Sequence, residues 1–163
     1  MIKSTYYQDL TKMNTFRMKV KAKCFIEYDS VADLVDIEFD ELSRPILHIG
    51  GGSNLLFTED FKGTVLHSKI NFIEILDECQ SISEAPSQAS LGPSPYPGVG
   101  KCLLHTNVTS SDSAEVLVSV GAGVIFDDFC DWAAKEGLWG VENLSYIPGE
   151  VGASAVQNIG AYG

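Results

Sequence analysis

The first stretch of this sequence that could bind a charged ligand is a run of three glycines at residues 50–52. It follows the apolar residues 46–49 and precedes Ser53 and Asn54, whose side chains can donate hydrogen bonds. Because glycine has no Cβ, successive backbone N–H groups can turn toward one point, and such a concave run of donors binds phosphate oxygens. Neither a P-loop nor a G-x-G-x-x-G pattern is present. The pattern favours a phosphate-binding turn, although a tight turn without a ligand has the same composition.

A second stretch, residues 146–163, is unusually rich in glycine and small side chains. Pro148 and Gly149 predict a turn. The small residues 152–155 predict a helix N-terminus whose free N–H groups point outward and could approach a ligand closely. The alternative is that these small residues serve tight helix packing.

Hydrophobic patterning predicts the elements that must position these two stretches. Asp29 or Ser30 can cap a short helix from Val31 to about Phe39, with Asp33 in its first turn. A second, amphipathic helix is predicted over 125–137. Its apolar face carries Ile125, Phe129, Trp132 and Ala133, and Gly137 can end it. Strands are predicted over 24–28, 46–50 (a buried one), 64–69, 71–76 and 114–123.

Residues 77–113 are rich in serine, proline and glycine, and only 102–108 could pair as a strand. This composition predicts a long inserted loop or an elongated hairpin. Nothing in its residue types points to chemistry, so we expect it to be mobile decoration.

Composition narrows the classes of function. The chain of 163 residues has 22 acidic and 11 basic side chains, for a formal net charge of −11. This balance excludes a non-specific nucleic-acid binder and argues against docking on anionic membranes. The four cysteines are far apart, which predicts reduced thiols and no metal site. No apolar run approaches the roughly 18 residues of a membrane span, and the N-terminus lacks a secretion signal. We expect a soluble cytoplasmic protein.

Two signatures together carry a family resemblance. The segment Gly-Gly-Gly-Ser-Asn-Leu-Leu at 50–56 and the segment 140–163 resemble the two FAD-binding signatures of UDP-N-acetylenolpyruvoylglucosamine reductases. Asn14-Thr15-Phe16 is similar to the N-terminal element of that family. The resemblance covers nearly the whole chain apart from 77–113, and Gln157-Asn158-Ile159-Gly160 resembles its first structural type.

The resemblance implies an α+β chain with the FAD-binding fold of the vanillyl-alcohol oxidase and CO dehydrogenase flavoprotein type, in which two α+β lobes grip the dinucleotide. The expected first lobe is 1–76, followed by the insert 77–113 and a truncated second lobe 114–163, without the substrate-binding domain. FAD would be held noncovalently, with its pyrophosphate on the glycine turn. The implied cofactor-binding residues are Gly50, Gly51, Gly52, Ser53, Asn54, Leu55, Ile147, Pro148, Gly149, Val151, Gly152, Ala153, Ser154, Ile159, Gly160 and Tyr162.

In the family the flavin takes hydride from NADPH and passes it to UDP-GlcNAc-enolpyruvate, which gives UDP-N-acetylmuramate for bacterial peptidoglycan. The resemblance places the catalytic arginine, serine (or cysteine) and glutamate beyond Gly163. We therefore expect no catalytic residue in this chain, no reductase activity from it alone, and weak FAD binding. Glu150 is expected to face solvent, and His48, His67 and His105 to have core or surface roles. The alternatives are another noncovalent FAD oxidoreductase of the same fold, or a stand-alone FAD-binding module without catalysis.

Overall fold

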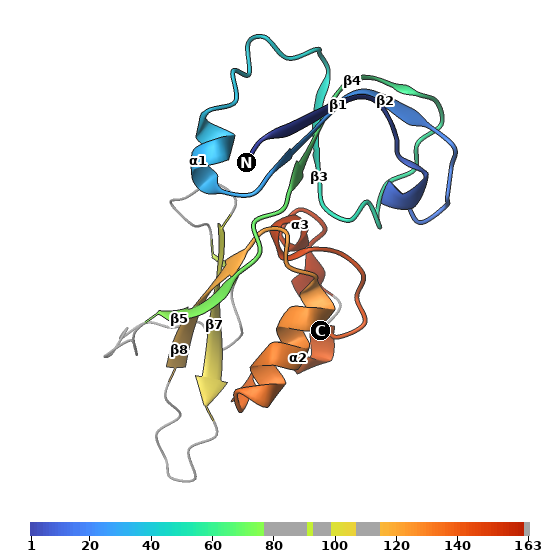
Figure 1. Cartoon of the computed structure of the whole chain (residues 1–163). Helices are drawn as coiled ribbons and strands as arrows, with labels where there is room; N and C mark the ends of the chain where they lie inside the picture. The colour runs from blue at the N-terminus through green and yellow to red at the C-terminus, as the bar shows by residue number, and fades with distance from the viewer. Residues whose placement is uncertain (77–90, 93–98, 107–114, 162–163) are drawn as a thin grey trace.

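The computed structural model describes residues 1–76, 91–92, 99–106 and 115–161. These residues form a mixture of helices and two β-sheets, which lie one above the other in Figure 1. Tyr162, one of the predicted cofactor-binding residues, lies outside the described part of the chain.

The first sheet has the strand order β1-β2-β4-β3. β1 pairs antiparallel with β2, whereas β2, β4 and β3 run parallel, so their carboxyl ends meet at one edge. β3 is an edge strand, and of its residues only Ile49 is buried, so the prediction of a buried strand was wrong there. The bounds are β1 Lys3–Asp9, β2 Lys21–Tyr28, β3 Ile46–Ile49 and β4 Phe61–Ser68, with a 3-10 turn η1 at Thr11–Met13.

Each face of this sheet is covered by its own apolar cluster. Val65 and Phe25 point to one cluster, and their neighbours Leu66 and Ile26 point to the other. The two central strands are therefore buried on both faces, which explains their continuous apolar runs.

The predicted first helix forms but is shorter than expected. α1 spans Val31–Val35, and the Ser30 hydroxyl accepts a hydrogen bond from the backbone N–H of Asp33 at 3.0 Å, as the capping pattern predicts. Of its apolar residues Leu34 is buried, whereas Val35 is 70% exposed. A helix this short depends on packing, and with so narrow an apolar contact it ends at Val35 instead of continuing to Phe39.

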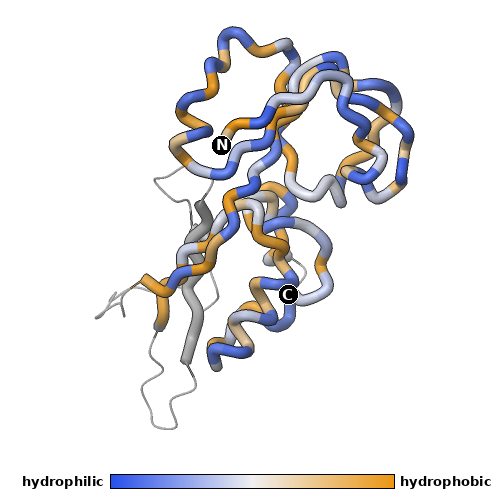
Figure 2. Tube along the Cα trace, viewed as in Figure 1, coloured by the Kyte–Doolittle hydropathy of each residue, from blue (hydrophilic) through white to orange (hydrophobic). Residues whose placement is uncertain are grey.

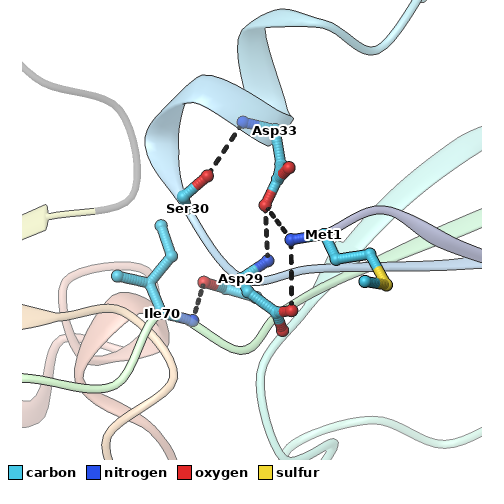
Figure 3. A network of polar contacts seen from close by, with 6 residues as sticks. Met1, Asp29, Ser30, Asp33 and Ile70 are labelled. Carbon is cyan, nitrogen blue, oxygen red and sulfur yellow. Dashed lines mark hydrogen bonds and ion pairs between the residues drawn. The ribbon is translucent and has the colours of Figure 1, made fainter.

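The N-terminal amino group is anchored next to this cap (Figure 3). It donates hydrogen bonds to Asp29 Oδ2 at 3.2 Å and to Asp33 Oδ2 at 2.6 Å. The hydrogen bond to Asp33 is the main reason that the pKa of the amino group is raised, and the same bond lowers the pKa of Asp33. The contact ties the beginning of β1 to the end of β2.

The second sheet is antiparallel, in the order β5-β8-β7-β6, with β9 also paired to β7. β7 pairs antiparallel with β8 from Val99 to His105, so a strand forms within the range 102–108 where the sequence predicted one. Residues 91–92 and 99–101 of the predicted insert are also described and belong to the antiparallel pair β6 and β7. The rest of 77–113, to which the expectation of mobile decoration applies, lies outside the described residues. The bounds are β5 Ile73–Leu76, β6 Leu91–Gly92, β7 Val99–Thr106, β8 Glu115–Gly121 and β9 Leu138–Trp139.

The predicted amphipathic helix forms as α2, Phe126–Lys135, and it packs on the second sheet. Its residues Phe126, Phe129, Cys130 and Ala133 are buried in one cluster with the valines of β8. In Figure 2 the helix alternates between apolar and polar residues around its axis. Gly137 follows the helix with a φ of 72°, which is the left-handed conformation expected of a glycine at this place. Ile125 precedes the helix and is 53% exposed, so it is not part of the apolar face.

The two sheets meet where β4 leads into β5. Gly121 and Gly123 donate backbone hydrogen bonds to Phe72 and Ile70, both at 2.9 Å. β5 lies within the range 1–76 expected for a first lobe, and it pairs in the second sheet. Three short turns complete the described chain: η2 Glu142–Leu144, α3 Val151–Ser154 and η3 Ile159–Ala161. None of the helices in the described residues is long and apolar enough to cross a membrane.

Candidate functional site

The glycine turn begins directly after β3, at the edge where the parallel strands of the first sheet end. Gly52 lies at its centre with a φ of 71°. Of the described residues, none accepts a hydrogen bond from the backbone N–H groups of Gly51, Gly52, Ser53 or Asn54. Unpaired N–H groups beside a left-handed residue are a feature of anion-binding nests, and the phosphate-binding interpretation of this turn stays a prediction.

The N-terminal element supports this turn from one side. The buried side chain of Asn14 donates to the Leu10 and Met18 carbonyls at 2.8 and 3.1 Å and accepts from the Met18 N–H at 2.8 Å. Thr15 then donates from its hydroxyl to the Ser53 carbonyl at 3.2 Å. Asn14 therefore fixes the conformation of its own loop, and Thr15 joins this loop to the glycine turn.

The second predicted stretch lies against the other side of the turn. The Ser53 hydroxyl donates to the Pro148 carbonyl at 3.1 Å, across 95 residues of sequence. A Cβ built on Gly50 would lie 3.0 Å from Ala153 Cβ and 3.4 Å from Glu150 Cβ. Figure 1 shows α3 close to the end of β3. The fold thus brings together the two segments that the sequence identified separately.

The N-terminus of α3 does not present free N–H groups, and that prediction was wrong. Val151 donates to the Val124 carbonyl and Gly152 to the Ala122 carbonyl, both at 2.9 Å. A Cβ on Gly152 would lie 2.6 Å from Ala122 Cβ, so Gly152 allows the turn after β8 to pack tightly against α3. The small residue at this position serves packing, the alternative that composition left open.

The other predicted site residues differ in their exposure to solvent. The side chains of Val151, Ser154 and Ile159 are buried with the core of the second sheet. Asn54, Pro148 and Gly160 are exposed, and no described atom lies within 4 Å of a Cβ built on Gly160. The contacts of all these residues with a cofactor remain predictions.

A buried polar cluster lies beneath the glycine turn, and sequence reasoning missed it. The His67 side chain is 4% exposed, with Nε2 3.0 Å from Glu150 Oε1 and Nδ1 3.4 Å from Glu27 Oε1. The Glu150 side chain is 12% exposed, so the expectation that it faces solvent was wrong. Its carboxylate lies beside the glycine turn, 3.4 Å from the position of a Cβ on Gly50.

Tyr28 and His48 extend this cluster along the strand ends. The Tyr28 hydroxyl lies 2.7 Å from His48 Nε2. His48 keeps exposed surface on the edge strand, yet desolvation around its ring lowers its pKa, the nearby His67 adds to this effect, and Glu150 opposes it. Burial raises the pKa of Tyr28. Both groups are therefore held in their neutral forms near pH 7.

Replacing Glu150 with alanine is expected to lower the free energy of unfolding by about 1–3 kcal/mol, because it removes a hydrogen-bond partner from the buried His67 ring. The exposed Glu38 provides the control, and its replacement by alanine is expected to change stability by less than about 0.5 kcal/mol. Urea unfolding followed by tryptophan fluorescence measures both. Equal stability of the two variants would show that the Glu150–His67 contact contributes nothing.

The described residues contain no group of three or more His, Cys, Asp or Glu side chains placed to hold a metal ion. Cys24 and Cys130 are free thiols in the core. Burial raises the pKa of Cys130 to about 11, so this thiol is not a nucleophile at neutral pH. The candidate site is therefore a surface of hydrogen-bond donors at a glycine turn.

Comparison with known proteins agrees with this type of site. Residues 98–163 match the family described as FAD binding domain. The chain is 44% identical over 155 residues to the UDP-N-acetylenolpyruvoylglucosamine reductase of Bacteroides fragilis (strain YCH46), which covers 94% of the chain and 37% of the relative.

Relatives with the same name in other bacteria match nearly the whole chain at somewhat lower identity. That of Porphyromonas gingivalis (strain ATCC 33277) is 37% identical over 94% of the chain and 36% of the relative. That of Neisseria meningitidis serogroup A is 39% identical over 97% of the chain and 37% of the relative. The chain thus spans a little over a third of the length of the curated relatives it matches. It is a homologue of part of the UDP-N-acetylenolpyruvoylglucosamine reductases and contains a match to an FAD-binding domain, whose wider family has the FAD-binding fold of vanillyl-alcohol oxidase.

Proposed function

We propose that this chain binds FAD noncovalently and that the pyrophosphate of FAD lies on the glycine turn. The observation that carries the proposal is the run of N–H groups at Gly51, Gly52, Ser53 and Asn54, which have no acceptor among the described residues. A pyrophosphate supplies only acceptors at neutral pH, and backbone amides are suitable partners for it. The match to an FAD-binding domain supports FAD as the dinucleotide.

The residues of the glycine turn are compatible with a noncovalently bound pyrophosphate. Gly51 is exposed, and a Cβ there would have only Glu150 Oε1 within 4 Å, at 3.8 Å, so the turn is accessible from outside. The turn 50–55 contains no histidine or cysteine, the side chains that could attach a flavin covalently. The carboxylate of Glu150 is an unfavourable charge beside the turn, and its contact with the buried His67 ring holds Oε1 in place.

We also propose that the two sheets act as two lobes that hold the dinucleotide between them. Supporting this, the first sheet supplies the glycine turn, and the second carries the segment 147–154 that packs against it. Residues 147–154, Leu55 and residues 159–162 would line the parts of FAD on either side of its pyrophosphate. These lobes differ in part from the expected ranges 1–76 and 114–163, because β5, β6 and β7 all belong to the second sheet.

For the whole protein we propose the activity that the relatives' name indicates, reduction of UDP-GlcNAc-enolpyruvate to UDP-N-acetylmuramate in the cytoplasm, with NADPH as hydride donor. FAD would supply the hydride transfer. The residues of this chain would bind and orient that cofactor. We assign no catalytic side chain to the chain, and none of its described residues touches a substrate in our proposal.

Titration of FAD with the purified chain tests the proposal directly. We expect saturable quenching of flavin fluorescence, reversed by excess ADP, because ADP carries the pyrophosphate and competes for the glycine turn. Quenching that does not saturate, in a chain shown by circular dichroism to be folded, would contradict FAD binding.

A further inference from the structure

Two buried side-chain atoms in the described part of the chain have no hydrogen-bond partner, Glu150 Oε2 and Gln157 Nε2. Buried polar atoms in folded proteins are nearly always paired, so each exception requires an explanation. Both atoms belong to the segment that packs against the glycine turn. Glu150 Oε2 is an acceptor and cannot pair with a phosphate oxygen, whereas Gln157 Nε2 is a donor and can.

The position of the Gln157 amide is fixed by its surroundings. The backbone N–H of Gln157 donates to the Ala153 carbonyl at 3.1 Å, which continues the turn of α3. Its Nε2 lies 3.2 Å from the position of a Cβ on Gly149, and Ser53 Oγ lies 3.6 Å from the same point. Gly149 has a φ of 142°, a conformation that residues with a side chain rarely adopt. The amide therefore lies where the second segment meets the glycine turn.

We propose that Gln157 is a cofactor-binding residue whose side-chain amide donates a hydrogen bond to a pyrophosphate oxygen of the dinucleotide on the glycine turn. The inference rests on the proposed function and deepens it. An unpaired buried donor is unfavourable, and an ionised phosphate oxygen next to the backbone donors of residues 51–54 gives it a charge-assisted partner. Gln157 thereby adds a side-chain donor from the second segment to the backbone donors of the first.

Gln157→Glu gives the sharpest test, because it preserves the shape of the side chain and replaces the donor with an ionised acceptor. We expect it to weaken binding of FAD and of ADP by about 100-fold, through a lost charge-assisted bond and a new repulsion. Binding of riboflavin, which has no phosphate, is expected to change by less than about threefold. Gln157→Met, which removes the donor without adding charge, is expected to weaken FAD and ADP binding by about 10-fold.

Asn158→Asp is the matched control. Asn158 is exposed and has a φ of 53°, a conformation that aspartate also tolerates, so this variant adds the same charge one residue away. We expect FAD affinity within about threefold of the wild type. Isothermal titration with FAD, ADP and riboflavin measures all variants, and circular dichroism confirms that they fold.

The outcomes separate the inference from the proposed function. If the wild type binds FAD and Gln157→Glu and Gln157→Met both stay within threefold of it, Gln157 does not contact the cofactor. If the affinity of either folded variant for riboflavin falls by as large a factor as its affinity for ADP, the amide does not act on the pyrophosphate. Either result overturns the inference and leaves FAD binding intact. A folded wild type that binds neither FAD nor ADP overturns the proposed function, and the inference with it. If Gln157→Glu does not fold, the affinities of Gln157→Met for FAD, ADP and riboflavin test the inference by the same criteria.

Discussion

Replacing Gly52 with alanine is expected to lower the free energy of unfolding by about 3 kcal/mol or more. A Cβ at this position would lie 1.8 Å from the backbone carbonyl oxygen of Met13, and Gly52 has a φ of 71°. The neighbouring atom is backbone and cannot rotate away, so the glycine turn or the N-terminal element would have to move. The positive φ adds the cost of a left-handed conformation for a residue with a side chain.

The adjacent glycine is the control for this prediction. A Cβ on Gly51 would have only Glu150 Oε1 within 4 Å, at 3.8 Å, and its φ is not in the left-handed region. Gly51→Ala is therefore expected to change stability by less than about 1 kcal/mol. Urea unfolding of both variants, followed by tryptophan fluorescence, compares them. Similar losses in the two variants would mean that the turn and the N-terminal element are not in the contact that the structure shows.

Replacing Phe129 with alanine is expected to cost about 3–5 kcal/mol of stability, because the side chain is fully buried in the core of the second sheet. Its ring packs edge-to-face on Phe126, with centroids 5.9 Å apart, and is stacked against Trp132 at 6.2 Å. The backbone N–H of Phe126 donates to the Gly149 carbonyl at 3.0 Å, so α2 also positions the second segment of the site.

Ile125→Ala serves as the control for this variant, because Ile125 is 53% exposed. We expect it to lower stability by less than about 1 kcal/mol. Thermal unfolding ranks the two variants, and FAD titration at low temperature shows whether loosening α2 also weakens the site. A Phe129→Ala variant as stable as Ile125→Ala would contradict the packing of α2 described here.

Much of the fold follows from local sequence patterns. The apolar runs that become β2, β4 and β8 and the amphipathic period of α2 identify these elements, because burial on a sheet face or along a helix face imposes these periods. Ser30 and Gly137 mark helix ends for reasons that are also local. The length of α1 is not predictable in this way, because a helix of one turn depends on tertiary contacts.

The candidate site is predictable only in part. Gly50–Asn54 and Pro148–Gly149 are recognisable because a glycine turn is a local property of the backbone. The His67 contacts are not recognisable, since Glu27 and Glu150 are 40 and 83 residues away in sequence. They depend on the register that pairs Glu27 with His67 in the parallel strands, and on the docking of α3. Sequence alone also could not show that Gly152 packs on Ala122 instead of exposing N–H groups.

The central claim is that the glycine turn at 50–54 holds the pyrophosphate of FAD, and one comparison tests it most directly. The wild-type chain, Gly51→Ala and Gly51→Val are each titrated into FAD while flavin fluorescence is recorded. Thermal unfolding first shows that all three proteins are folded. We predict saturable quenching with the wild type, reduced but measurable affinity with the alanine variant, and loss of binding with valine, whose branched side chain would crowd the turn. Folded wild type without saturable quenching, or a folded valine variant that binds FAD as tightly as the wild type, would contradict the claim.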